Sequence, residues 1–346
     1  MPRLRRSDCS GPGITRVRRG RGFVYRDPDG QRIDDELLLE RIGGLAIPPA
    51  WKDVWICTDD LGHLQATGID DAGRKQYLYH PLWHQRRGRE KFDRMLRFGE
   101  NQPRLRRRVL RDLRGEEPTR MRVLAGAVRL LDLGLFRVGN EVYAEDNGSF
   151  GLTTLHKQHV TINDALLRFD YPAKSGVERV QVVHDRRSAA LLDQLKRRRG
   201  GGPELLAYRD GRRWHPVSAD EVNNYLKAVL GEEFSAKDFR TWNATVIAAT
   251  ALAGARHRRD SEQRATPRAS TKTSREREIK AAVKVVAASL GNTTTVARNS
   301  YIDPRVFDRY RAGRTIAIDP GRLHPGRERD RQEIERAVLE LLTGGR

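Results

Sequence analysis

The chain has 346 residues, 38% of them hydrophobic, which is enough apolar material for two domains with a core each. Lys and Arg number 66 against 46 for Asp and Glu, so the formal net charge is +20. This excess indicates a polyanionic partner, and nucleic acid is the first candidate. The two cysteines, Cys9 and Cys57, have no CxxC spacing and no neighbouring His, which argues against a zinc site and against a disulfide framework.

The first quarter of the chain is predicted to be a flexible basic arm followed by a small β-sheet domain. The segment through Arg21 is rich in Arg and Gly, as expected of an arm that frays. Residues 23–80 contain FVYRDPDGQRI and GHLQATGIDDAGRKQYLYH, in which turn signals separate short β-prone runs. This pattern predicts hairpins.

The pattern changes to helix from about Lys91. Residues 103–113 are a basic helix candidate, and apolar residues recur at helical spacing in the segment from Met121 to Leu135. The polar run HQRRGRE at residues 84–90 predicts a domain boundary. We therefore expect a β-rich DNA-binding domain at 1–88 and a mainly helical domain at 89–346.

The helical part contains a second predicted β region at about residues 158–184, where HVTIND and RVQVVH flank the loop DYPAKSG. The fold class that follows is α+β, with a β hairpin inserted in the larger, mainly α-helical domain. Residues 256–272 have almost no apolar side chains and are predicted to be a solvated linker. Helix starts are predicted at Asp185 and at three pairs that resemble capping boxes: Ser218 with Glu221, Ser235 with Asp238, and Thr273 with Glu276.

The chemistry is predicted to need neither a metal nor a cofactor. Clustered carboxylates for metal-assisted phosphoryl transfer do not occur, and AKSG lacks the upstream glycines of a GxxxxGK(S/T) loop. Any reaction on phosphate must then rely on cations and hydrogen bonds.

Four short segments contain candidate residues for such chemistry, and each is individually ordinary. Lys237 and Arg240 lie in SAKDFRT at a helix start, where two cations oppose the helix dipole, a local conflict that favours a functional role. The other three segments are RVGNE with Arg137, AKSG with Lys174, and LGNTTTVARNSYIDP with Asn292 and Tyr301.

The order of these residues resembles the type IB DNA topoisomerases, especially the compact poxvirus and bacterial form. IPPAWKDVWIC and GHLQATGIDDAGRKQYLYH look like the family's N-terminal domain. RVGNEVYAEDNGSFGLTTL, KDFRTWNAT and the Tyr301 segment look like its catalytic domain. The poxvirus form has His where this chain has Asn292, which is a departure from the pattern of that form.

The resemblance implies a clamp around duplex DNA that relaxes supercoils through a 3′-phosphotyrosyl intermediate, without ATP. Tyr301 would be the nucleophile, Arg137 and Arg240 would hold the scissile phosphate, Lys174 would protonate the leaving 5′ oxygen, and Asn292 would donate to a non-bridging oxygen. Nearby guanidinium groups would favour ionisation of a phenol. The implied protein is a monomer, cytoplasmic and nucleoid-associated, with further DNA contacts at Gln76, Tyr77, Tyr79, Tyr143 and Lys237.

Two other readings of the sequence remain. A tyrosine recombinase uses the same covalent chemistry, but such enzymes typically carry HxxR where this chain has KDFR, and they lack the QYLYH sheet domain. A non-catalytic DNA-compacting protein would explain the charge of +20, but it would not require the ordered set of residues.

Overall fold

The structure is a computed structural model that describes residues 2–139, 148–265, 272–319 and 327–344. The chain divides into two compact units, Met1–Asp93 and Arg94–Arg346. The division falls inside helix α2 (Pro81–Asp112), so the polar run expected to separate two domains is helical.

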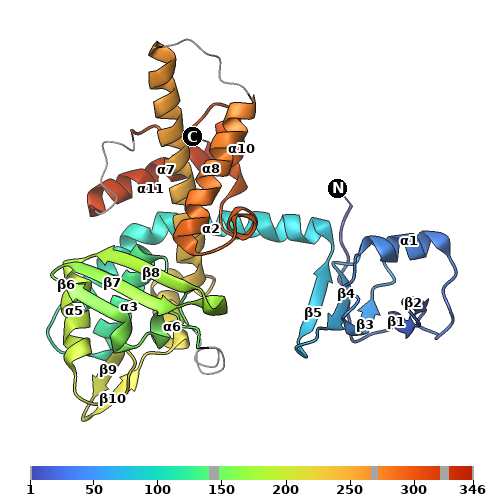
Figure 1. Ribbon diagram of the computed structural model, residues 1–346, viewed down its shortest axis with the longest axis horizontal. Helices are drawn as coiled ribbons and strands as arrows, with labels where there is room; N and C mark the ends of the chain where they lie inside the picture. Colours follow the sequence, from blue (N-terminus) through green and yellow to red (C-terminus); the bar gives the residue numbers. More distant parts are fainter. Residues whose placement is uncertain (1, 140–147, 266–271, 320–326, 345–346) are drawn as a thin grey trace. The chain divides into compact units, whose positions relative to one another are not determined.

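The first unit is a five-stranded antiparallel sheet with strand order β2-β1-β3-β4-β5 (Figure 1). The strands are β1 (Ile14–Arg19), β2 (Gly22–Arg26), β3 (Lys52–Ile56), β4 (Leu64–Ile69) and β5 (Lys75–Tyr79). Helix α1 (Glu36–Gly44), which the sequence did not predict, begins where Asp35 accepts a hydrogen bond from the Leu38 amide. The β-rich prediction is confirmed for the sheet.

The prediction of a flexible arm through Arg21 is wrong for most of its length. Strand β1 lies within this segment, and Arg5 forms a β-bridge with Gly62. The reason is Ile14, which is 2% exposed and packs in the core of the sheet unit with Val54 and Ile56. Burial of one large apolar side chain outweighs the tendency of the surrounding Arg and Gly residues to stay solvated.

The second unit contains an antiparallel sheet with strand order β6-β7-β8, next to helices α3 (Arg120–Gly134) and α5 (Arg186–Arg197) (Figure 1). Its strands are β6 (Val160–Asn163), β7 (Leu166–Pro172) and β8 (Glu178–His184). Buried and exposed residues alternate along β7, so one face packs on the helices. The predicted inserted hairpin is therefore present, as part of a three-stranded sheet.

The rest of the second unit is mainly helical. A hairpin of β9 (Ala207–Asp210) and β10 (Arg213–Pro216) precedes the remaining helices, and α7 and α8 pack side by side (Figure 1). The helices are α6 (Ala219–Leu230), α7 (Ala236–Ala265), α8 (Lys272–Leu290), α9 (Thr294–Ser300), α10 (Pro304–Arg311) and α11 (Glu328–Thr343). Short 3₁₀ turns lie at η1 (Leu152–Thr154), η2 (Lys157–His159) and η3 (Lys174–Gly176). Among the described helices, none is long and apolar enough to cross a membrane.

Three of the four predicted helix starts are confirmed. Asp185 caps α5, Ser218 and Glu221 form a capping box at α6, and Asp238 accepts a hydrogen bond from the Ser235 amide at the start of α7. A helix is also present at the fourth place, but the described part of α8 already starts at Lys272, so Thr273 lies inside the helix and does not cap it.

The predicted linker at 256–272 is also wrong for residues 256–265, which continue α7. Ion pairs support this polar stretch in place of apolar contacts. Arg256 pairs with Asp260 one turn later, at 3.4 Å, and Arg259 pairs with Glu278 of α8 at 2.6 Å.

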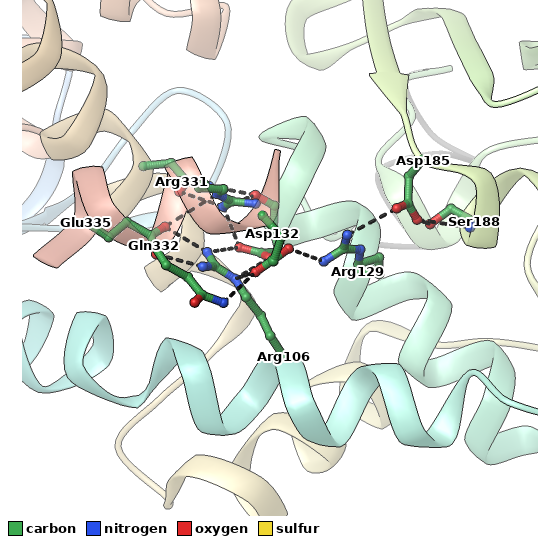
Figure 2. A network of polar contacts seen from close by, with 10 residues as sticks. Arg106, Arg129, Asp132, Asp185, Ser188, Arg331, Gln332 and Glu335 are labelled. Carbon is green, nitrogen blue, oxygen red and sulfur yellow. Dashed lines mark hydrogen bonds and ion pairs between the residues drawn. The ribbon is translucent and has the colours of Figure 1, made fainter. Parts of the chain in front are cut away.

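A buried ion network joins α2, α3, α5 and α11 (Figure 2). Arg106 of α2, 3% exposed, donates to Asp132 of α3 at 2.9 Å and to Glu335 of α11 at 2.7 Å. Arg331 of α11 also donates to Asp132, at 2.6 Å. Arg129 extends the network to the α5 cap, Asp185, at 3.1 Å. The network fixes α3 from several sides, and Arg137 follows directly on its C-terminal end.

Candidate active site

The carbonyl end of α8 is the structural centre of the site. Gly291 has φ +60°, which lets the chain reverse after the helix. Its amide donates to Ala288 O at 3.2 Å, and the Asn292 amide donates to Ala287 O at 3.0 Å. These two bonds leave the carbonyls of Ser289, Leu290 and Gly291 without backbone donors in the helix.

Three arginines from separate elements donate to these three consecutive carbonyls. Arg179 of β8 reaches Ser289 O at 2.5 Å, Arg240 of α7 reaches Leu290 O at 2.9 Å, and Arg137, in the loop after α3, reaches Gly291 O at 3.2 Å. None of the three forms an ion pair with a carboxylate of the described residues. The negative end of the helix dipole therefore supports a cluster of positive charge that no described acidic side chain neutralises.

Arg240 is the most buried member of the cluster, at 3% exposed. It donates to Leu135 O at 2.5 Å, and Leu135 holds this carbonyl in place through a left-handed backbone conformation, φ 59°. Burial, and next the positive charge of Arg137, lower the pKa of Arg240 to about 10. The group is still a cation at neutral pH.

Tyr301 ends helix α9, and Asp303 caps α10, which begins at Pro304. The Cζ atom of Arg240 lies 5.3 Å from the centroid of the Tyr301 ring. Burial by itself raises the pKa of the Tyr301 phenol, but Arg240 and, to a smaller extent, Lys237 and Arg137 outweigh it. The net pKa of Tyr301 is lowered, so the site favours the phenolate.

Asn292 faces the cluster with both ends of its amide. Its Oδ1 accepts a hydrogen bond from Arg137 at 2.7 Å. Its Nδ2 is buried and has no hydrogen-bond partner among the described residues. Buried donors are almost always paired in folded proteins, so an unpartnered amide nitrogen next to this cluster is a candidate hydrogen-bond donor to a bound ligand.

The two lysines lie outside the hydrogen-bonded cluster. Lys237 is exposed in the first turn of α7 and acts on Tyr301 through its charge. Lys174 is exposed in η3, between β7 and β8, and makes no hydrogen bond or ion pair with the described residues. The structure thus brings Arg137, Arg240, Asn292 and Tyr301 together, and leaves Lys174 at a turn tip.

Three of the predicted DNA contacts, Gln76, Tyr77 and Tyr79, lie on strand β5 of the first unit. Tyr77 and Tyr79 lie on β5 with ring centroids 6.2 Å apart and an interplanar angle of 18°, so they share one face of the strand, and Tyr77 is exposed. The Gln76 amide donates to Asp70 at 2.8 Å. Tyr143 lies outside the described residues.

The sequence reasoning missed Arg179. A signal was present, because the alternation of β8 places Arg179 on the same inward face as Gln181 and Val183, which are buried. An arginine on the buried face of a strand is uncommon unless it has a partner.

The cluster is suited to an anionic ligand, because buried cations without counter-ions are costly unless an anion joins them. A phenol of lowered pKa beside such a site is suited to attack on phosphorus.

Comparisons with known proteins agree with this chemistry. Residues 81–321 match the family model described as eukaryotic DNA topoisomerase I, catalytic core, and residues 22–70 match that of the bacterial DNA topoisomerase IB N-terminal domain.

The chain is also 31% identical to the DNA topoisomerase 1B of Acanthamoeba polyphaga mimivirus over 303 residues, which are 84% of this chain and 85% of that protein. The expected family is confirmed by a core match that spans most of the chain and by a relative that spans nearly the same length. The chain therefore belongs to the type IB DNA topoisomerases, isomerases that relax supercoiled DNA without ATP.

Proposed function

We propose that the Tyr301 hydroxyl oxygen attacks a phosphodiester of duplex DNA and forms a 3′-phosphotyrosyl bond. The P–O5′ bond breaks in the same step, and the 5′ oxygen leaves as a hydroxyl. The reverse attack of that hydroxyl expels Tyr301 and reseals the strand. The ester keeps the energy of the broken bond, so resealing needs no ATP. The position of the Tyr301 ring, whose centroid lies 5.3 Å from Arg240 Cζ in a cluster of cations, carries this proposal, and the lowered pKa of the phenol agrees with it.

The guanidinium groups of Arg137 and Arg240 stabilise charge on the non-bridging oxygens during the displacement. Both groups are already oriented by main-chain carbonyls. Asn292 supplies a neutral donor through its unpartnered Nδ2. These three side chains need little reorganisation when the phosphate arrives.

Lys174 is proposed as the general acid that protonates the leaving 5′ oxygen. Its place at the tip of the β7–β8 turn leaves the ammonium group free to enter a DNA groove. The role predicts that Lys174→Ala slows cleavage by about 10²- to 10⁴-fold. A bridging 5′ sulfur is a leaving group that needs no proton, so it should restore most of that loss.

We further propose that the protein acts as a monomer, because Arg137, Arg240, Asn292 and Tyr301 already form one cluster within a single chain, with no residue needed from a second copy. Gln76, Tyr77, Tyr79 and Lys237 are proposed to contact DNA outside the scissile phosphate. The charge of +20 favours a protein that stays associated with chromosomal DNA.

The experiment that tests the proposal is cleavage of a duplex by the parent and by Tyr301→Phe. The substitution removes one oxygen and no charge, so duplex binding should be nearly unchanged. The parent should form a denaturation-resistant adduct with DNA, and the Phe variant should form none. An adduct formed by the Phe variant would exclude Tyr301 as the nucleophile.

A further inference from the structure

Arg179 lies next to the cluster but has no role in the cleavage reaction proposed above. It lies on β8, the strand that follows the Lys174 turn, and is paired with Tyr171 of β7. Its guanidinium donates to Ser289 O at 2.5 Å. A Cβ atom built on Gly291 would lie 2.3 Å from Arg179 Nη1, so the guanidinium also packs directly on the backbone of that glycine.

These two contacts connect the sheet to the loop that presents Asn292. The Asn292 amide is bonded back to Ala287 O, so its position depends on the position of the end of α8. Arg137 is bonded to Gly291 O and to Asn292 Oδ1, and therefore depends on the same segment. A displacement of this segment would misplace both side chains.

We propose that Arg179 is a positioning residue for DNA cleavage, which holds the carbonyl end of α8 against β8 and thereby sets the places of Asn292 and Arg137. The inference rests on the proposed function of this cluster. Arg179 acts through main-chain atoms, so its contribution is to the geometry of its neighbours.

The chemistry of the guanidinium group suits this position. Its donors are fixed in a plane, so one group can donate to a carbonyl while its face packs on a glycine. Burial lowers the pKa of Arg179, and the positive charge of Arg137 adds to this effect. A cation kept half-buried next to another cation, with no carboxylate partner among the described residues, is costly for stability, which favours a functional reason for its presence.

The test is a double-mutant cycle on single-turnover cleavage with Arg179→Ala, Asn292→Ala and the combined variant. Arg179→Ala should slow cleavage by about 10- to 10²-fold, the range for loss of a charge-assisted hydrogen bond. The loss in the combined variant should be smaller than the product of the two single losses, because part of the Arg179→Ala defect acts through Asn292. Arg179→Lys keeps the charge and one donor, so it should recover part of the rate.

A substrate with a 5′ bridging sulfur distinguishes an effect of Arg179 on Asn292 and Arg137 from an effect on the protonation step assigned to Lys174. It should restore Lys174→Ala but leave the defect of Arg179→Ala in place. Rescue of Arg179→Ala by sulfur, or an additive loss in the double-mutant cycle, would overturn the assignment. If the Ala variant does not fold, the double-mutant cycle and the sulfur-substrate measurements are made with Arg179→Lys and Arg179→Gln instead.

Arg198 provides a matched control in the same unit. It is buried and donates to Leu195 O at 2.8 Å and to Leu205 O at 3.0 Å, away from the cluster. Arg198→Ala should lower the melting temperature but leave the cleavage rate at the parent value. An equal slowing by Arg198→Ala would show that Arg179→Ala acts through general destabilisation, and would overturn the inference. Adduct formation by the parent and its loss in Tyr301→Phe report on the proposed function separately.

Discussion

Asn292 gives a sharp test of the site, because the two ends of its amide have different surroundings. Oδ1 accepts from Arg137 at 2.7 Å, whereas Nδ2 is buried without a partner among the described residues. The change Asn292→Asp keeps the acceptor and the shape, and replaces the free donor with an anionic oxygen. The change Asn292→Ala removes both ends.

The two roles that Asn292 can have predict opposite orders of rate. If Nδ2 donates to a phosphate oxygen, Asn292→Ala should cost about 10²- to 10³-fold in cleavage rate. Asn292→Asp should be slower still, because a carboxylate about 4 Å from an anionic phosphate adds repulsion of about 4 kcal/mol at an effective dielectric constant near 20. If Asn292 only holds Arg137, Asp should be faster than Ala, since it keeps the hydrogen bond.

The assay is single-turnover formation of the covalent adduct on a duplex substrate, with the variants compared across pH. Asn292→His should retain much of the rate, and its profile should acquire a titration near the usual His pKa of about 6.5. The parent should lack that titration, because an amide does not exchange a proton in this range. A rate for Asn292→Asp equal to or above that of Asn292→Ala would refute the donor role.

Two further predictions follow from the charges of the catalytic unit. Lys237 lowers the pKa of Tyr301, so Lys237→Gln should raise that pKa and move the dependence of the cleavage rate on pH to higher pH, with the largest loss of rate at low pH. As a control, Arg336→Gln removes one exposed charge from α11 and should leave the pH dependence unchanged. Asp132→Asn should lower the free energy of unfolding by about 3–5 kcal/mol, because it removes the buried carboxylate that Arg106 and Arg331 share and leaves Glu335 as their common buried partner. Burial alone would raise the pKa of Asp132, but Arg106 and Arg331 hold it far below its usual range. This stabilisation is present above the unfolded-state pKa of about 3.9 and is lost on acidification. The free energies of unfolding of the parent and the variant, measured by urea titration, should therefore converge below about pH 4. A difference that does not shrink there would contradict the ion-pair account.

The sequence predicted the parts of the fold that depend on local pattern. Alternation in β7, the helical spacing in α3 and the cap at Asp185 each act over a few residues, and each is confirmed. The wrong predictions concern segments that are stabilised by contacts with residues distant in the sequence. In the first strand, Ile14 packs in a core with residues of β3 and β4, and near the end of α7, Arg259 pairs with Glu278 of α8.

The candidate site likewise has residues that the sequence predicts and features that depend on contacts between distant residues. The residues named from the sequence were found through their order along the chain, and the structure brings four of them into one cluster. Arg179 was missed because its role depends on Ser289, a residue 110 positions away, and on the direction of a strand face. The buried, unpartnered donor of Asn292 likewise depends on three-dimensional packing, which no spacing of residues reveals.

The use of main-chain carbonyls to hold the arginines has a chemical consequence. A carboxylate at the same distance would hold a guanidinium more strongly, but it would cancel the charge that a phosphate must find, and it would compete with the phosphate for the same donors. A carbonyl carries only a partial charge, so Arg137 and Arg240 are oriented and still electropositive. The carbonyls at the end of α8 therefore give the site order without neutralising it, which is what in-line attack on a phosphodiester without a metal requires.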